Sequence, residues 1–94
     1  MQPWEVKMNR NGMRPIHPGE ILREEFLQPL EITIVALARS LNEPQAQISD
    51  VVRQQRAVSA ALAKKLSIHL NTTPEFWLNL QSTFDLRTTK IERG

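Results

Sequence analysis

Apolar residues recur along the chain at three- and four-residue intervals, and we find no alternating apolar run long enough to indicate a sheet. The clearest stripe is formed by Ile34, Leu37, Ala38 and Leu41, which share one face of a helix. Capping residues and prolines divide the rest of the pattern. Together these features predict an all-α fold with five helices, at about residues 18–28, 33–41, 45–53, 60–70 and 74–86.

Residue types that begin or end helices stand at the predicted boundaries. Thr33 and Ser59 can each accept a hydrogen bond from the backbone of a first helical turn. Pro44 suits the first position of the third helix, and Pro18 suits the first turn of the first helix. Pro29 should end that first helix, because proline cannot continue the helical hydrogen bonds.

One small domain accounts for most of the chain. Residues 1–13 lack periodicity and are predicted to form a flexible arm, residues 14–87 hold the five helices, and the tail 88–94 is expected to fray. The 94 residues include no cysteine, so the 40% apolar residues must form a core without disulfides. Neither a membrane-spanning run nor a signal-peptide stretch is found, and we expect a cytoplasmic protein without a membrane partner.

Two of the predicted helices are short and closely spaced. Residues 33–41 and 45–53 are joined by about three residues, which is the proportion of a helix-turn-helix motif. On a helical wheel of about 100° per residue, Ile48, Val51 and Val52 share one side of the second helix. The polar opposite side is therefore expected to project outward, as in a recognition helix that enters the DNA major groove.

This polar side carries side chains that can read bases. Glutamine pairs with adenine, arginine grips guanine, and a small alanine can meet a thymine methyl group, while serine and loop residues can bind phosphates. A carboxylate near phosphates costs affinity unless it accepts from a cytosine amino group or pairs with a cation, and for Asp50 we favour a pair with Arg53, one turn away. An ordinary solvated helix face remains the alternative. The candidate DNA-binding residues are Thr33, Gln45, Ala46, Gln47, Ser49, Asp50, Arg53, Gln54, Gln55 and Arg56.

Three stretches resemble the HigA family of antitoxins, within the lambda-repressor-like helix-turn-helix group. RPIHPGEILREEFLQPL (14–30) is similar to the family's start, ALARSLNEPQAQISDVV (36–52) lies where the family has its helix-turn-helix, and TPEFWLNLQSTFDL (73–86) resembles its C-terminal signature. The resemblance implies a five-helix lambda-repressor-like bundle. It also implies a type II antitoxin that neutralises a ribonuclease toxin of the HigB type, which cleaves messenger RNA. As a homodimer, such a protein binds operator DNA and represses its own operon.

Two positions depart from the family's pattern. Gln54 stands where the family often has a glycine, so Gln54 must adopt a left-handed conformation or the recognition helix must run on before turning. Ile34 stands where related domains often carry a polar, phosphate-binding side chain. Some affinity for DNA is therefore expected to be lost, or shifted to Thr33 and Arg56.

Surfaces for protein partners are less sharply indicated. The last helix carries more apolar area than one helix of a small monomer needs, so these residues either form part of a dimer seam or simply cover the bundle. They are Phe76, Trp77, Leu80 and Phe84. The acidic segment Glu20–Glu25 could meet a basic toxin, and the arm 1–13 with its apolar Trp4 could fold onto one.

Catalysis is not expected. His17 and His69 are the only histidines, and we find no metal-binding pair, nucleophile elbow or phosphate loop, so neither a cofactor nor a metal is predicted. Two other functions stay open: a stand-alone helix-turn-helix transcriptional regulator, and a helical protein-interaction module that has lost DNA binding. The small net charge of +2, together with Ile34 and Asp50, favours the latter somewhat.

Overall fold

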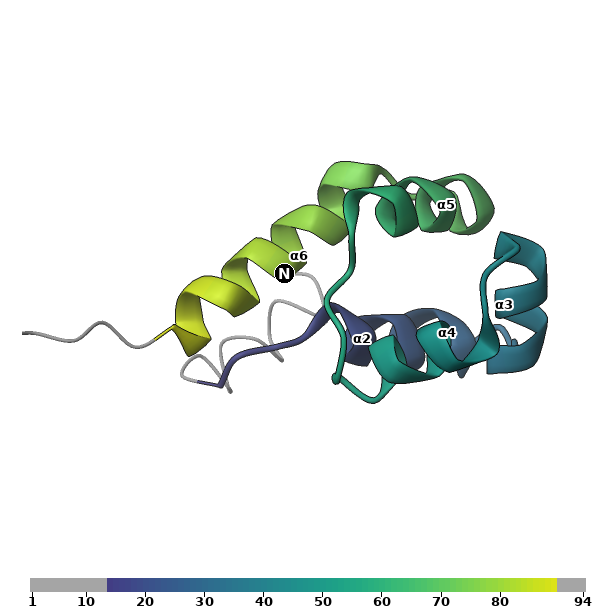
Figure 1. Ribbon diagram of the computed structural model, residues 1–94, viewed down its shortest axis with the longest axis horizontal. Helices are drawn as coiled ribbons and strands as arrows, with labels where there is room; N and C mark the ends of the chain where they lie inside the picture. The colour runs from purple at the N-terminus through teal and green to yellow at the C-terminus, as the bar shows by residue number, and fades with distance from the viewer. Residues whose placement is uncertain (1–13, 90–94) are drawn as a thin grey trace, which may run out of the picture.

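The computed structural model describes residues 14–89, and within this range the chain is helical without strands. The segments are α2 (Pro18–Ile21), η1 (Leu22–Leu27), α3 (Ile34–Leu41), α4 (Gln45–Val52), α5 (Ala60–Leu70) and α6 (Pro74–Thr88). Because η1 continues α2 directly, as a π-helical stretch, these segments are the five predicted helices (Figure 1). The all-α prediction is confirmed. The predicted arm 1–13 and residues 90–94 of the predicted tail lie outside the described residues.

Hydroxyl groups cap three helices, two of them at the predicted residues Thr33 and Ser59. In each case the side-chain oxygen accepts a hydrogen bond from a backbone N–H three residues further on, which satisfies a donor that the helix itself leaves unpaired. The pairs are Thr33 with Ala36 (3.0 Å), Ser59 with Leu62 (3.2 Å) and Thr73 with Phe76 (3.1 Å). Pro44 differs slightly from the prediction, because it is the N-cap of α4 and Gln45 is the first helical residue.

The first helix begins and ends at prolines, as predicted. Pro18 lies in the first turn of α2, and the π-helical stretch ends at Leu27, with Gln28 as its C-cap. Beyond Pro29 the chain turns, and Glu31 adopts a positive φ of 55°. At the other end of the fold, α6 continues to Thr88, one residue beyond the predicted domain boundary.

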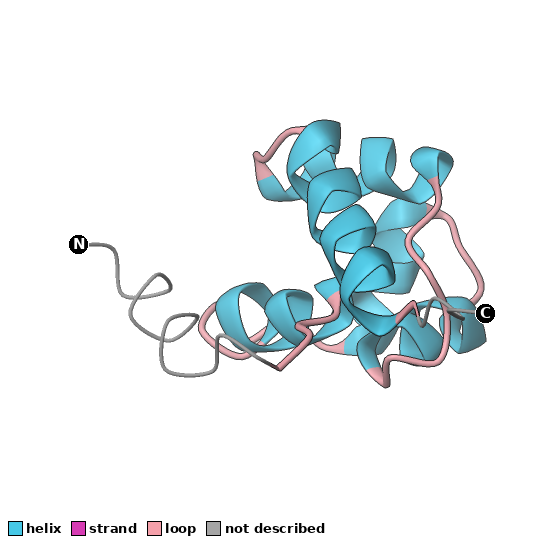
Figure 2. Cartoon of the chain, turned by 90° about the vertical axis from the view of Figure 1, so that its left-hand side faces the viewer, coloured by secondary structure: helices cyan, strands magenta, loops and turns pink. Residues whose placement is uncertain are grey.

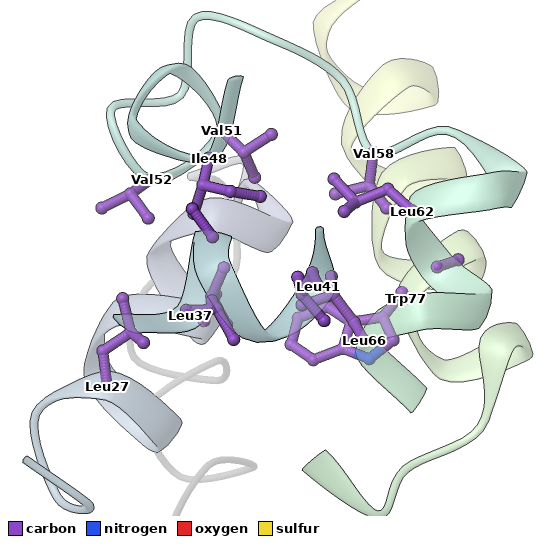
Figure 3. Packing of buried hydrophobic residues seen from close by; sticks show 13 residues of the cluster. Leu27, Leu37, Leu41, Ile48, Val51, Val52, Val58, Leu62, Leu66 and Trp77 are labelled. Carbon is purple, nitrogen blue, oxygen red and sulfur yellow. The ribbon is translucent and has the colours of Figure 1, made fainter. Parts of the chain in front are cut away.

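The core lies between two groups of helices. Helices α5 and α6 pack against each other on one side, and α2, α3 and α4 lie on the other (Figures 1 and 2). Figure 3 shows apolar side chains from both groups meeting in the middle, among them Leu37, Ile48, Leu66 and Trp77. No helix within the described part of the chain is long and apolar enough to cross a membrane.

Trp77 lies at the centre of this core and is not on a surface. Its side chain is 0% exposed, its ring lies 5.5 Å from that of Phe26, and its Nε1 donates a hydrogen bond to Oγ1 of Thr72 at 2.8 Å. For this residue the dimer-seam interpretation is wrong, because no area is left for a second subunit. Leu80 is also half-buried against the core, whereas Phe76 remains 38% exposed.

Candidate nucleic-acid interface

Helix α4 turns one side into the core and the other toward solvent. Ile48, Val51 and Val52 are buried, whereas Gln45 and Ala46 are exposed at the start of the helix. Gln47, Ser49 and Asp50 are half-buried, and the remaining candidates (Thr33, Arg53, Gln54, Gln55 and Arg56) are exposed. The outward orientation of the amide-rich side is therefore confirmed. That these side chains bind DNA remains a prediction.

On the buried side of α4, the first turn of α2 packs directly against the helix backbone. A Cβ atom placed on Gly19 would lie 1.8 Å from the carbonyl oxygen of Val51 and 2.7 Å from its carbonyl carbon. Only glycine permits this approach, because any side chain would overlap the backbone of α4. The sequence held no signal for this contact of Gly19 with Val51, which is 32 positions away.

The chain reverses directly after α4. Gln54 adopts a left-handed conformation with φ 65°, and its backbone N–H donates to the carbonyl oxygen of Val51 at 2.9 Å. The next N–H, of Gln55, donates to the carbonyl oxygen of Asp50 at 2.8 Å. Of the two alternatives for this position, the strained turn is therefore the one that occurs, at a cost on the order of 1 kcal/mol for a residue with a Cβ.

This reversal also corrects the predicted ion pair of Asp50. The turn at Gln54 brings Arg56 back beside the helix, and Nη2 of Arg56 lies 3.6 Å from Oδ2 of Asp50. The predicted partner, Arg53, is instead the C-cap of α4. Both side chains of the observed pair are at least one-third exposed, so the pair contributes little to stability. It does, however, neutralise the carboxylate on the candidate DNA-binding face.

Ile34 has a structural role that explains its departure from the family's pattern. The residue is the first of α3, where its half-buried side chain packs against the core. The neighbouring Thr33 remains exposed and caps the helix. An apolar contact thus replaces a polar group at this position, while an exposed hydroxyl is retained one residue earlier.

The segment that follows α4 is anchored to α6 by a buried glutamine. Oε1 of Gln81 accepts a hydrogen bond from the backbone N–H of Val58 at 2.8 Å, and Nε2 of Gln81 donates to Oδ1 of Asp85 at 2.9 Å. Val58 itself is buried. The stretch 73–86 that resembles the family's C-terminal signature contains Gln81, but the sequence assigned it no function, because its partner lies 23 residues away.

His17 is the second buried polar residue behind the interface. It is 2% exposed, and its Nδ1 accepts a hydrogen bond from the N–H of Gly19 at 2.9 Å, so that it caps α2. Its ring also packs edge-to-face on Phe84, with 4.8 Å between the centroids. Burial lowers the pKa of His17, and a nearby carboxylate (Asp85) and a backbone hydrogen bond with Arg56 offset this only in part.

The lowered pKa of His17 predicts that the folded protein loses stability in mild acid. The unfolded chain binds a proton near pH 6.5, whereas the folded protein keeps His17 neutral to a lower pH. The stabilisation is therefore complete above about pH 6.5 and is lost as the pH falls from there through the folded-state pKa. We expect the urea midpoint to fall between about pH 7.5 and about pH 5.5 in the unmodified chain. The urea midpoint of the His17→Asn variant should fall less, because asparagine can cap the helix but does not titrate in this range. An equal fall in both proteins would contradict the assignment of this acid sensitivity to His17.

In this five-helix domain α3 and α4 form a helix-turn-helix, and its second helix is exposed. The fold therefore defines a helix-turn-helix protein, and similarity to known proteins agrees with this class. The helix-turn-helix family model matches residues 22–77. Antitoxin HigA-1 of Vibrio cholerae is 39% identical over 83 residues, which are 88% of this chain and 78% of that protein. The chain belongs to the HigA family of helix-turn-helix proteins.

Two solved structures share this fold. One is described as Pseudomonas aeruginosa antitoxin HigA with higBA promoter; it has a TM-score of 0.79 and 49% identity, and the match covers 80% of this chain and 82% of that one. The other is described as antitoxin GraA in complex with its operator, with a TM-score of 0.76 and 56% identity over 80% of this chain and 76% of that one. The expected five-helix fold is thereby confirmed.

Proposed function

We propose that this protein is an antitoxin that binds the operator of its own operon and represses it. The observation that carries the proposal is the outward-facing side of α4, where Gln45 and Ala46 are exposed while Ile48 and Val51 anchor the helix in the core. The proposal is supported by the similarity to HigA and GraA proteins whose structures are described with promoter or operator DNA. A cytoplasmic location follows from a DNA ligand.

Each part of the face has a role in this proposal. Gln45 and Gln47, in the first turn of α4, make base contacts in the major groove, and Ala46 between them meets a thymine methyl group. The sugar-phosphate backbone is contacted by the remaining polar candidates, which are Thr33, Ser49, Arg53, Gln54, Gln55 and Arg56. Asp50 holds Arg56 in place, so that the carboxylate is neutralised and the guanidinium still has exposed surface for a phosphate.

The operator is bound by a homodimer in this proposal. A two-fold axis would place two copies of α4 about 34 Å apart, one turn of DNA, and the operator would be correspondingly palindromic. With Trp77 in the core, the predicted seam residues that remain are Phe76, Leu80 and Phe84. Of these three, Phe76 has the most exposed position and is the first residue to test in such a seam.

The protein partner is a ribonuclease toxin of the HigB type, an inference supported by the similarity to antitoxin HigA-1. The suggested acidic surface for this toxin needs correction. Glu20 is buried, and both of its oxygens accept hydrogen bonds from Arg14 at 2.9 Å. Only Glu24 and Glu25 keep part of their surface toward solvent, and Glu24 already pairs with Arg23 at 3.0 Å. The segment is therefore less acidic at its surface than its sequence indicates.

Alanine substitutions on α4 test the base-reading role. Gln45→Ala and Gln47→Ala should each weaken binding to the protein's own promoter by about 1–3 kcal/mol for a lost bidentate contact. The same substitutions should hardly change binding to unrelated DNA. Fluorescence anisotropy with labelled promoter and scrambled duplexes measures both affinities.

Arg56→Ala provides the matched control, because a phosphate contact carries no base information. It should weaken binding to both duplexes alike and reduce the slope of log affinity against log salt. If neither glutamine variant changed promoter binding, the recognition role of α4 would be wrong. The protein-interaction module would then be the better description.

A further inference from the structure

His17 joins three parts of the fold behind the candidate DNA-binding face. It caps α2 through Gly19, its ring packs on Phe84 of α6, and it lies close enough to the backbone of Arg56, in the segment after α4, for that backbone to influence its pKa. Two of these contacts lead directly to the face. Gly19 touches the backbone of Val51 in α4, and Arg56 carries one of the candidate phosphate-binding side chains.

The hydrogen bond with Gly19 requires one protonation state of the ring. Nδ1 accepts from the N–H of Gly19, so this nitrogen carries no proton. In a neutral imidazole the other nitrogen, Nε2, then has the hydrogen. A second proton would have to go onto Nδ1, where it would face the N–H of Gly19 and remove the cap.

We propose that His17 is a positioning residue for operator binding, and that its protonation in mild acid weakens this binding. The inference rests on the proposed function, because it concerns the same face. A protonated His17 no longer holds the first turn of α2, which touches α4 at Val51. It also carries a charge in a buried site, which favours movement of the ring away from Phe84 and Arg56. Both movements displace candidate DNA-binding groups without involving DNA contacts by His17 itself.

The charged groups around the ring do not stabilise an imidazolium enough to offset its burial. From α6, Asp85 favours the protonated form, but its Oδ1 is already engaged by Nε2 of Gln81. On the segment of His17 itself, the carboxylate of Glu20 is held by both terminal nitrogens of Arg14. From the turn after α4, the guanidinium of Arg56 lies beside Asp50.

The experiment compares promoter affinity at about pH 7.5 and about pH 5.5 for three full-length chains. These are the unmodified protein, His17→Asn and, as the matched control, His69→Asn, which removes the only other histidine. His69 is exposed near the end of α5. Asparagine at position 17 can still accept from the N–H of Gly19 but does not titrate in this range. Fluorescence anisotropy gives the affinities, and far-UV circular dichroism at the same temperature and pH verifies that each chain is folded.

The unmodified protein and His69→Asn should lose more affinity on acidification than His17→Asn, by less than about tenfold, because tenfold is the limit that one coupled proton sets at about pH 5.5 when its pKa lies below 6.5. Comparing the three chains removes effects of pH that they share. Equal acid sensitivity in all three would overturn the inference while leaving the proposed function intact. A loss of affinity that only parallels a loss of helical signal would also overturn it, because His17 would then act through stability alone. No promoter binding by any chain at either pH would overturn both proposals.

Discussion

Gly19→Ala is expected to destabilise the protein by at least about 1–3 kcal/mol, although alanine is the better helix former. In an open helix the same change would stabilise by about 0.5–1 kcal/mol. Here the new methyl group would lie 1.8 Å from the carbonyl oxygen of Val51, which is backbone and cannot rotate away. Relief therefore requires α2 and α4 to move apart, which opens the core at Ile48 and Val51. Urea denaturation followed by circular dichroism measures the change.

The reciprocal substitution Ala61→Gly is the control for helix propensity. Ala61 lies on the exposed side of α5, so its replacement should cost only about 1 kcal/mol. If close packing of α2 on α4 governs position 19, both variants lose stability, and Gly19→Ala also loses promoter affinity, because α4 is displaced. A stabilised Gly19→Ala protein would show that α2 and α4 do not approach as closely as described.

Trp77→Ala is expected to produce the largest loss of all, about 3–5 kcal/mol. The indole of Trp77 is fully buried against Phe26 and the other core side chains. Its removal leaves a cavity and takes away the hydrogen bond that Nε1 donates to the hydroxyl oxygen of Thr72. Domains of this size have a total stability of about 5–15 kcal/mol. The melting temperature should therefore fall well below that of the unmodified protein, as measured by thermal denaturation.

Phe76→Ala separates the contribution of the core from that of aromatic residues in general. Phe76 is the chain neighbour of Trp77, and their rings lie 5.0 Å apart, but its side chain is 38% exposed. It should lose much less stability than Trp77→Ala. If Phe76 belongs to a dimer seam, its substitution should instead lower the apparent mass in sedimentation. Equal stability losses in the two variants would contradict the central position of Trp77.

Much of the fold could be predicted because the signals are local. A hydroxyl residue such as Thr33 or Ser59 caps a helix through an N–H three residues away, and a proline limits the conformations of its neighbours wherever it stands. The burial of Ile48 and Val51 also follows from helical periodicity, since residues at this spacing share a face. These effects act within one or two helical turns, so the chain itself contains the information.

The contacts that support the candidate site could not be predicted in the same way. Gly19 lies 32 positions before Val51, and Gln81 bonds to a residue 23 positions away, so neither pairing leaves a periodic trace in the sequence. Asp50 had two arginines within reach. Sequence spacing alone favoured an ion pair of Asp50 with Arg53. The left-handed turn at Gln54 instead brings Arg56 beside Asp50.

By itself, the sequence determined the helices, their caps, the inner side of α4 and the resemblance to the HigA family, because each depends on neighbours in the chain. Tertiary structure alone decided which polar groups hold the candidate DNA-binding side in place and that Trp77 belongs to the core. It also decided that Glu20 is not a free surface charge. The physical reason is the same in all these cases. Burial and long-range hydrogen bonds depend on how separate helices meet, and that geometry is settled only when the whole core packs.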